Sequence, residues 1–473
     1  MSITIKNTEN VMNIDLNTIH NVYFVGAGGI GMAALERYFL AKGKKVAGYD
    51  RTPTALTEEL RAEGVEMTFD ESADNIPEDF RDPATTLVVY TPAVPVDLPI
   101  LTYFRDNGFE VMKRAAVLGL ITRNSRSLCF AGTHGKTTTS SMAAHILNSG
   151  SIGCNAFLGG ELINYGTNFL LKPSSDFSVI EADEFDRSFH HLTPYIAVIT
   201  ATDPDHLDIY GTEEAYLESF AHFTELIRPG GALIVHEGLK LHPRPQDGVR
   251  VYTYSRDKGD FHAKYIRRQH GSITFDIVTP RGTIRNVNLG VPVEVNIENA
   301  VAAVAAVCLT DGWDPTVIRE AINSYRGTKR RFETHLKEDN GAGHIIIDDY
   351  AHHPEEVRKS IESVKALYPG RRLTVAFQPH LYSRTRDFAP EFADALSAAD
   401  SLVLLDIYPA REQPIEGVTS QIIFDNVKCS DKILIPKEKL VETLKNRNFD
   451  ILLTLGAGDI NTFIPRIIDA LDD

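Results

Sequence analysis

The chain has 473 residues, enough for about two to four domains of ordinary size. It has 48 lysine and arginine residues against 64 aspartate and glutamate residues, a net charge of −16 at pH 7. This charge argues against nucleic acid or an anionic membrane as the partner. No apolar run reaches the length of a membrane span, and the N-terminus lacks a hydrophobic signal core. With four scattered cysteines in mostly apolar segments, these features predict a cytosolic protein with reduced thiols.

The first predicted α/β domain covers residues 20–125, after a polar N-terminal extension at 1–19. A buried strand at 21–25 leads into a glycine-rich turn, and a helix follows at 32–42. The turn contains Gly26, Gly28, Gly29, Ile30 and Gly31. G-x-G-x-x-G between a strand and a helix lets a diphosphate approach the backbone. Taken alone, the motif also fits a nicotinamide oxidoreductase or a tight turn without a ligand.

Two further strand ends point to the same crevice of this domain. The strand at 45–49 ends in Asp50, at the spacing of an acid that binds a ribose. The strand that begins at residue 86 runs into a loop with Thr91 and Pro92. Because ligands of open α/β sheets bind at the carboxyl ends of strands, we expect both to face the ligand.

The second predicted domain covers residues 126–325 and opens with a phosphate-binding pattern. A buried strand at 128–131 and a helix at 140–147 flank the loop, which contains Gly132, Thr133, His134, Gly135, Lys136, Thr137 and Thr138. Backbone amides and the helix N-terminus would hold phosphates, Lys136 would reach the β- and γ-phosphates, and Thr137 would bind Mg²⁺. Phe130 replaces the first glycine of the strict motif, so the loop is a variant. We expect a nucleoside-triphosphate site, against the alternative of an ordinary glycine-rich turn.

Acidic strand ends downstream of this loop predict a metal site. The strand at 176–180 ends in an acidic segment that begins with Glu181, and the strand at 196–200 is followed by His206. Acids at such a strand end are placed to hold Mg²⁺, and His206 suits a second ion or a phosphoryl contact. A solvated acidic turn and an ordinary Asp-His hydrogen bond are the alternatives. Residues 232–289 are β-rich, and we expect an antiparallel appendage to the central sheet there.

The third predicted domain covers residues 326–473. It begins with a basic linker, which follows a helix of small residues at 296–307. The amides of this helix could recognise the edge of a nucleotide base; a polar cap on a buried helix is the alternative. Its predicted strands, at 344–347, 372–377, 401–405 and 450–455, all end in polar or charged segments. Since the carboxyl ends of parallel strands meet at one edge of the sheet, this edge is predicted to be an active site.

Three α/β domains with these motifs resemble the Mur ligases, the ATP-dependent amide-forming enzymes of peptidoglycan precursor synthesis. The phosphate loop marks the wider superfamily. More specific segments lie at 26–32, 181–184, 348–354, 377–380, 383–387 and 408–415. They resemble the members that join L-alanine to UDP-N-acetylmuramate. A sibling group that reattaches a recycled tripeptide shares the phosphate loop and the acidic segment.

The resemblance implies an α/β fold of three domains: a Rossmann-like domain for the UDP substrate, a central P-loop ATPase-type domain with the β-rich appendage, and a Rossmann-like C-terminal domain. It implies UDP-N-acetylmuramate and L-alanine as substrates, with ATP and two Mg²⁺ ions, in a monomer or homodimer. The diphosphate would lie on the Gly26–Gly31 turn. One Mg²⁺ would be bound by Thr137 and Glu181, the other by His206.

The resemblance also assigns roles in the C-terminal half. ATP would be contacted by Asn296, Arg331, Asp349 and Tyr350, and the alanine carboxylate by His380 and Arg384. Three departures from common family patterns concern neighbouring positions: Ala201, Val295 and Leu381.

The implied chemistry is transfer of the ATP γ-phosphoryl group to the muramyl carboxylate, followed by attack of the alanine amine on the acyl phosphate. His352, His353 and His380 are the possible acceptors of the amine proton. Three rival functions remain: a nicotinamide oxidoreductase, a regulatory protein that binds both nucleotides without coupling them, and the tripeptide-recycling ligase.

Overall fold

The structure is a computed structural model, and it describes residues 16, 18–91, 93–204, 207–269, 271–337, 343–410 and 412–472. Contacts within the chain define two compact units. The first contains residues 1–264, 277–285 and 298–322, and the second contains 265–276, 286–297 and 323–473.

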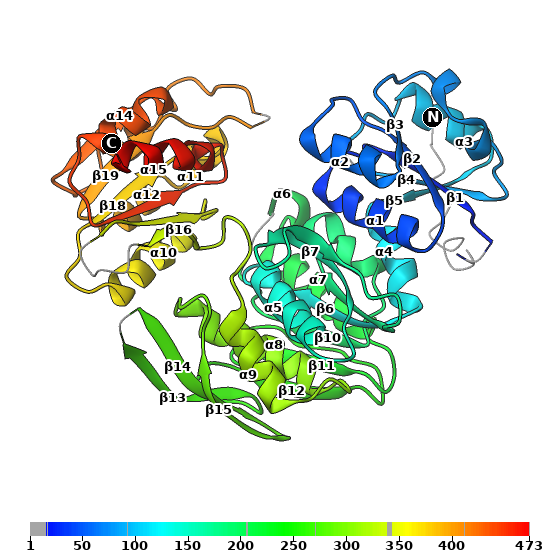
Figure 1. Ribbon diagram of the computed structural model, residues 1–473, viewed down its shortest axis with the longest axis horizontal. Helices are drawn as coiled ribbons and strands as arrows, with labels where there is room; N and C mark the ends of the chain where they lie inside the picture. Colours follow the sequence, from blue (N-terminus) through cyan, green and yellow to red (C-terminus); the bar gives the residue numbers. More distant parts are fainter. Residues whose placement is uncertain are drawn as a thin grey trace. The chain divides into compact units, whose positions relative to one another are not determined.

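The N-terminal part of the first unit is a five-stranded parallel sheet in the order β3-β2-β1-β4-β5 (Figure 1). The strands are β1 (Asn21–Val25), β2 (Lys45–Tyr49), β3 (Glu66–Thr68), β4 (Thr86–Tyr90) and β5 (Glu110–Lys113). The helices are α1 (Ile30–Ala41), α2 (Ala55–Glu63), α3 (Pro99–Asp106) and α4 (Arg114–Arg123). Because β1 lies between β2 and β4, the glycine turn after β1 is flanked by Asp50 and Thr91, as the sequence predicts.

The central sheet of the first unit has seven strands in the order β12-β11-β10-β6-β9-β7-β8. They are β6 (Arg126–Ala131), β7 (Asn155–Leu162), β8 (Thr167–Leu170), β9 (Phe177–Glu181), β10 (Ile196–Ile199), β11 (Ala232–His236) and β12 (Arg250–Tyr254). Its helices are α5 (Lys136–Ser149), α6 (Leu207–Tyr210) and α7 (Glu213–Glu225). Since β6 lies between β9 and β10, the phosphate loop, the acidic segment and the loop after β10 start at neighbouring strand ends.

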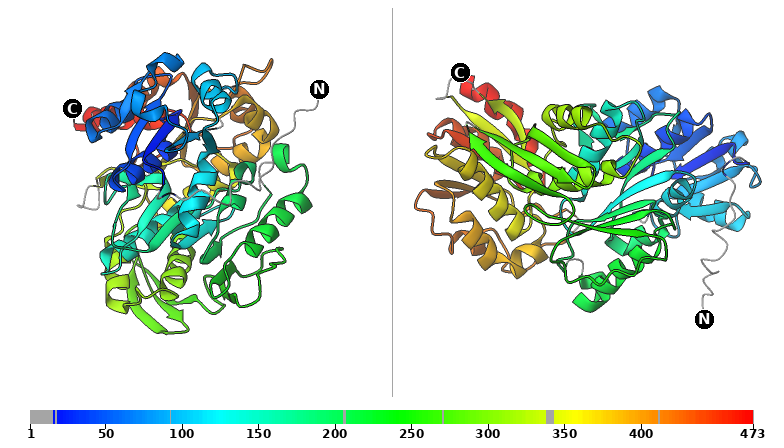
Figure 2. Two further views of the ribbon diagram at one scale, coloured as in Figure 1. Left: turned by 90° about the vertical axis from the view of Figure 1, so that its right-hand side faces the viewer. Right: turned by 90° about the horizontal axis from the view of Figure 1, so that it is seen from below.

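The predicted antiparallel appendage is only partly correct. β11 and β12 pair in parallel and extend the central sheet, so residues 232–254 are not part of an appendage. The separate sheet consists of β13 (His262–Gln269), β14 (Ser272–Thr279) and β15 (Gly282–Asn288), which lie side by side in Figure 2. Helices α8 (Val295–Cys308) and α9 (Pro315–Ser324) follow. The small sheet and α8 contribute residues to both units.

The second unit contains a six-stranded sheet in the order β16-β17-β21-β18-β19-β20. Its strands are β16 (Glu333–Lys337), β17 (Ile345–Asp349), β18 (Leu373–Phe377), β19 (Ser401–Leu405), β20 (Lys432–Ile435) and β21 (Ile451–Leu455). Only β16 pairs antiparallel to its neighbour, at the edge of the sheet. The helices are α10 (Pro354–Leu367), α11 (Tyr382–Asp387), α12 (Ala389–Leu396), α13 (Gln421–Phe424), α14 (Leu440–Lys445) and α15 (Ile464–Asp472).

The inner strands of the three mostly parallel sheets are almost entirely buried, because helices or loops cover both of their faces, whereas the edge strands β3, β12 and β20 are partly exposed. The four cysteines are buried thiols, as the sequence predicts. Within the described ranges, no helix combines the length and hydropathy needed to cross a bilayer.

Candidate functional site

The phosphate loop has the backbone that its glycines predict. Gly132 and Gly135 have φ angles of +139° and +83°. A Cβ on Gly132 would lie 2.2 Å from Thr200 Oγ1, so only glycine fits there. Phe130 is a fully buried residue of β6, and the loop therefore begins after the strand, which explains why a glycine is not needed at position 130. Lys136 is the first residue of α5, directly at the helix N-terminus.

Lys136 is held by a buried carboxylate. Its Nζ lies 2.8 Å from Glu184 Oε2 and donates to the carbonyl oxygen of Gly132 at 2.7 Å. Glu184 is 1% exposed, and burial raises the pKa of its carboxyl group while Lys136 opposes that rise. The sequence places Glu184 within the acidic segment but indicates no role for it. In this structure Glu184 is the group that keeps the lysine ammonium in the loop.

Thr137 and Glu181 meet as predicted. The Thr137 hydroxyl donates to Glu181 Oε1 at 2.9 Å, and the backbone N–H of Gly159 donates to Oε2 at 2.9 Å. A Cβ on Gly159 would lie 2.5 Å from both carboxylate oxygens, so the absence of a side chain makes room for Glu181. A hydroxyl and a carboxylate beside a phosphate loop are a donor set that fits Mg²⁺. Gly159 lies on β7, which the sequence analysis did not identify.

Neighbouring segments fix the rest of the loop. The Thr133 hydroxyl donates to the carbonyl oxygen of Asp203 at 2.7 Å, and the Thr133 N–H donates to that of Ala201 at 3.1 Å. The Nε2 atom of His134 lies 4.0 Å from an Asp203 carboxylate oxygen. From α8, the side chain of Asn299 accepts a hydrogen bond from the Thr139 hydroxyl at 3.2 Å and lies against Gly135. Asn299 is thus a loop neighbour that the sequence analysis missed.

The glycine turn after β1 is tied to the end of β2. The Gly28 N–H donates to Asp50 Oδ2 at 2.7 Å, and the Thr52 N–H donates to Oδ1 at 3.2 Å. Gly26 has a φ of +86°, and a Cβ there would lie 2.4 Å from Thr91 Cγ2. Since Asp50 already accepts the Gly28 N–H, the amides left to face a diphosphate are those at the start of α1, which has no side-chain cap.

A cavity of about 310 Å³ reaches from the turn to Glu181, one of the predicted metal residues. Its lining includes Gly29, Ile30, Gly31 and Thr91 from the N-terminal sheet and Glu181 from the central sheet. The Nδ2 atom of Asn168, on β8, donates to the Ile30 carbonyl oxygen at 3.1 Å and so links the turn to the central sheet. Four of the predicted substrate residues and the predicted metal residue Glu181 therefore line one cavity.

In the second unit, the end of β17 gathers the predicted ATP-contacting residues. The guanidinium carbon of Arg331 lies 5.3 Å from the centre of the Tyr350 ring, and that of Arg330 lies 5.0 Å from it. Arg330 forms an ion pair with Asp348 at 3.2 Å and donates to the carbonyl oxygen of Gly458 at 2.9 Å. Arg330 is therefore structural, and the contact of Arg331 with the ATP phosphates stays a prediction.

Asp349 accepts a hydrogen bond from the Ser360 hydroxyl. Burial raises its pKa to about 6, so its ionised form is disfavoured in the fold. A carboxyl group beside a hydroxyl can accept hydrogen bonds from ribose hydroxyls, and this role of Asp349 stays a prediction.

Asp349 gives a prediction about stability. With a folded pKa above the unfolded value, its stabilising contribution is complete below pH 3.8 and is lost as pH rises through about 6. Asp349→Asn should therefore raise the free energy of unfolding at pH 8 by roughly 1–3 kcal/mol, with little change at pH 3.5. Denaturant unfolding of both proteins at the two pH values measures this difference, and equal or lower stability of the variant at pH 8 would contradict it.

Two predicted histidines come together at neighbouring loops. The rings of His352 and His380 lie 6.1 Å apart, and His380 stacks on Tyr408 at 5.8 Å with an interplanar angle of 13°. The end of β21 lies between them, where Gly456, with a φ of +136°, approaches the backbone of Gln378. His352 Nδ1 lies 3.0 Å from the Tyr350 carbonyl oxygen, whereas His380 Nδ1 has no hydrogen-bond partner in the described part of the chain.

Arg384 completes this cluster. It lies on α11, and its positive charge, after burial, helps to lower the pKa values of both histidines. Among the described residues, no ion pair or hydrogen bond engages its guanidinium. Leu381, before α11, has φ 69° and ψ 137°, a conformation that is strained for leucine. Next to it, Glu412 accepts hydrogen bonds from Ser383, so the glutamate supports α11 instead of neutralising Arg384.

The histidine pKa values predict a pH effect on stability. Burial lowers the pKa of His380 to about 4, so the folded protein keeps this ring neutral near pH 7. The stabilisation from the neutral ring is complete above pH 6.5 and is lost as pH falls towards 4. The melting temperature of His380→Asn should therefore fall less between pH 7.5 and pH 5 than that of the unsubstituted protein. Parallel losses would show that the ring does not titrate in this way.

The remaining predicted residues lie outside the clusters described above or outside the described part of the chain. Asn296 is buried, and its Nδ2 atom donates to the Val291 carbonyl oxygen at 3.1 Å, which favours the cap on a buried helix over base recognition. His353 packs edge-on against Phe388 at 5.0 Å. Val295 is 44% exposed at the start of α8. Pro92 and His206 lie outside the described residues, as does most of the extension at 1–19.

The fold and these sites define a class: a nucleotide-binding α/β protein with a P-loop-type centre beside a diphosphate turn, and a separate cationic and histidine-rich strand edge. Three family signatures match the chain. They are described as Mur ligase family, catalytic domain (residues 21–126), Mur ligase middle domain (130–307) and Mur ligase, glutamate ligase domain (330–458). The chain belongs to the Mur ligase family.

Curated relatives align with this chain over nearly its full length. The UDP-N-acetylmuramate–L-alanine ligase of Phocaeicola vulgatus is 57% identical, covering 97% of this chain and 100% of its own. The protein of the same name from Porphyromonas gingivalis is 51% identical, covering 94% and 97%. Among solved structures, the UDP-N-acetylmuramate-alanine ligase MurC of Thermotoga maritima has a TM-score of 0.77 at 27% identity, covering 96% and 99%. A murein peptide ligase from Psychrobacter arcticus, 21% identical with a TM-score of 0.63, shares the fold.

Proposed function

We propose that this protein joins L-alanine to the lactyl carboxylate of UDP-N-acetylmuramate, with conversion of ATP to ADP and phosphate. The observation that carries the proposal is the cavity in which the diphosphate turn and Glu181, which holds Thr137, lie together. A nucleotide sugar on the turn would extend towards the side chains beside the phosphate loop. Full-length identity to the two curated alanine ligases supports the same activity.

The first step activates the carboxylate. A carboxylate oxygen attacks the γ-phosphorus of ATP, ADP leaves, and an acyl phosphate forms. Lys136 would offset the charge gathered between the two anionic reactants. Thr137 and Glu181 would hold Mg²⁺, which supplies further positive charge at the phosphates.

The second step forms the amide. The neutral alanine amine attacks the acyl carbon, and phosphate leaves from the tetrahedral intermediate. Arg384 would bind the alanine carboxylate, because its guanidinium lacks a counter-ion among the described residues and matches a carboxylate bidentately. His352 and His380 are neutral near pH 7 and are the candidate groups for handling the amine proton.

A cytosolic enzyme with two Mg²⁺ ions, active as a monomer or homodimer, is part of the same proposal. The rival functions differ in what they require. A nicotinamide oxidoreductase has no use for Lys136 and Glu181, and a regulatory protein has no use for the arginine and histidine cluster around His380.

The test is product formation. The purified protein with ATP, Mg²⁺, UDP-N-acetylmuramate and L-alanine should give a nucleotide product heavier by one alanine residue, detected by mass spectrometry, together with one ADP per product. ADP formation without an amide product, or no reaction unless a nicotinamide cofactor is present, would contradict the proposal.

A further inference from the structure

Arg114 is a half-buried cation without a counter-charge among the described residues. It is the first residue of α4, and it lines the cavity that holds the glycine turn and Glu181. Among the described residues of that lining, it is the only basic side chain. Glu181 and Asp183 line the same cavity, yet in the described part of the chain no carboxylate comes within 4.0 Å of the Arg114 guanidinium and no hydrogen bond engages it.

The local structure gives this charge no support either. The first turn of a helix is the positive end of its dipole, and α4 has no acidic residue there. A partly buried positive charge without a partner is unfavourable, so its retention in a cavity calls for an anion from outside the chain.

The position of Arg114 identifies which anion. A Cβ on Gly31 would lie 2.8 Å from Arg114 Nη1 and 3.2 Å from Cζ, so the guanidinium lies directly against the glycine turn. Gly31 has no positive φ angle that would require glycine. Its lack of a side chain is instead explained by the space that Arg114 occupies.

We propose that Arg114 binds the diphosphate of the nucleotide-sugar substrate, opposite the backbone amides at the start of α1. The planar guanidinium can engage two phosphate oxygens at once. It also supplies the positive charge that neutral backbone amides lack. This inference rests on the proposed function, because it names a residue for the diphosphate of that substrate. Lys113 next to it is already paired with Asp186 at 3.4 Å and does not line the cavity, so it provides a matched control.

The binding test is calorimetric titration of the full-length protein with UDP, UMP and uridine. Arg114→Ala should weaken UDP binding at least tenfold and leave uridine binding unchanged, with Arg114→Lys intermediate and Lys113→Ala close to the unsubstituted protein. Equal UDP affinity of Arg114→Ala and the unsubstituted protein would overturn the inference, as would an equal loss for uridine. If the unsubstituted protein bound no UDP, the proposed function would fail together with this inference.

A second test needs no ligand and examines the contact itself. Gly31 lies inside α1, so Gly31→Ala adds a helix-favouring residue, but its methyl group also displaces the Arg114 guanidinium. The change should therefore raise the melting temperature clearly more in the Arg114→Ala background, where the space is empty, than in the unsubstituted protein. Equal effects in both backgrounds would show that Arg114 does not lie against the turn and would overturn the assignment.

Discussion

Replacing Lys136 with alanine is expected to reduce turnover about a thousandfold or more, because the lysine ammonium is the positive charge that the phosphate loop contributes to the transferring phosphoryl group. The structure adds a second consequence. The substitution leaves Glu184, which is 1% exposed, without its ion-pair partner. An uncompensated buried charge costs about 3 kcal/mol, so Lys136→Ala should also lose stability.

A second variant separates the two effects. Lys136→Ala combined with Glu184→Gln removes both charges, and we expect it to recover most of the melting temperature while turnover stays absent. Phosphate release and thermal unfolding of the single and double variants are the measurements. Recovery of turnover in the double variant would mean that Lys136 acts only by neutralising Glu184, and its role on the phosphates would have to be abandoned.

Replacing Arg384 with alanine should raise the alanine concentration required for half-maximal rate by roughly 30- to 150-fold, equivalent to about 2–3 kcal/mol for a charge-assisted pair. The reason is that Arg384 lies beside His352 and His380 with no carboxylate of the described chain to neutralise it. A carboxylate ligand would therefore be its partner. The KM values for ATP and for the nucleotide sugar should stay within about twofold, since neither binds this guanidinium in the proposed mechanism.

The matched control for Arg384 is on the same helix. Arg386 is exposed and paired with Asp387 at 2.7 Å, so Arg386→Ala should leave all three KM values unchanged. If both variants raised the alanine KM equally, the effect would come from the general field of α11. An unchanged alanine KM in Arg384→Ala would remove that residue from the amino-acid site.

Much of the fold could be predicted because the buried strands are short apolar runs followed by glycine turns or acids. The strands at 21–25 and 401–405 have the predicted bounds. The main error concerned β11 and β12. Parallel neighbours are usually joined by a helix, but residues 237–249 between them contain none, so the pattern suggested an antiparallel appendage. β12 is also a half-exposed edge strand, and its pattern does not resemble a buried parallel strand.

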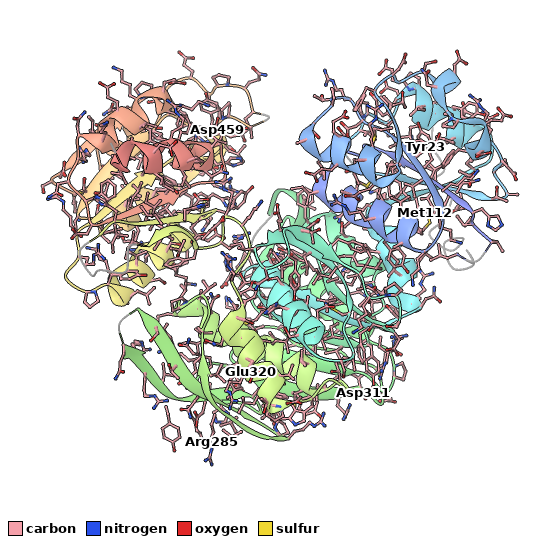
Figure 3. The ribbon with its side chains drawn as sticks, viewed as in Figure 1. Tyr23, Met112, Arg285, Asp311, Glu320 and Asp459 are labelled. Carbon is pink, nitrogen blue, oxygen red and sulfur yellow. The ribbon has the colours of Figure 1, made fainter. Side chains whose placement is uncertain are left out.

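The candidate site was predictable where one local motif contains it. The contact between Thr137 and Glu181 follows from two adjacent strand ends, each marked by its sequence. Glu184 and Arg114 could not be assigned, because their roles depend on partners 48 and 83 positions away that no local pattern links. Asp459, labelled in Figure 3, also depends on a partner that is distant in sequence: it accepts a hydrogen bond from Gln378 Nε2 at 2.8 Å and supports the loop before His380.

The most direct test of the proposed reaction is phosphate release from ATP and Mg²⁺ with UDP-N-acetylmuramate, offering L-alanine, glycine, L-serine or the recycled tripeptide as the amine. We predict release that requires the nucleotide sugar and is strongest with L-alanine. Release only with the tripeptide would assign the protein to the recycling ligases. No release with any of the four amines would contradict the proposed reaction and leave only the two nucleotide sites of the first unit.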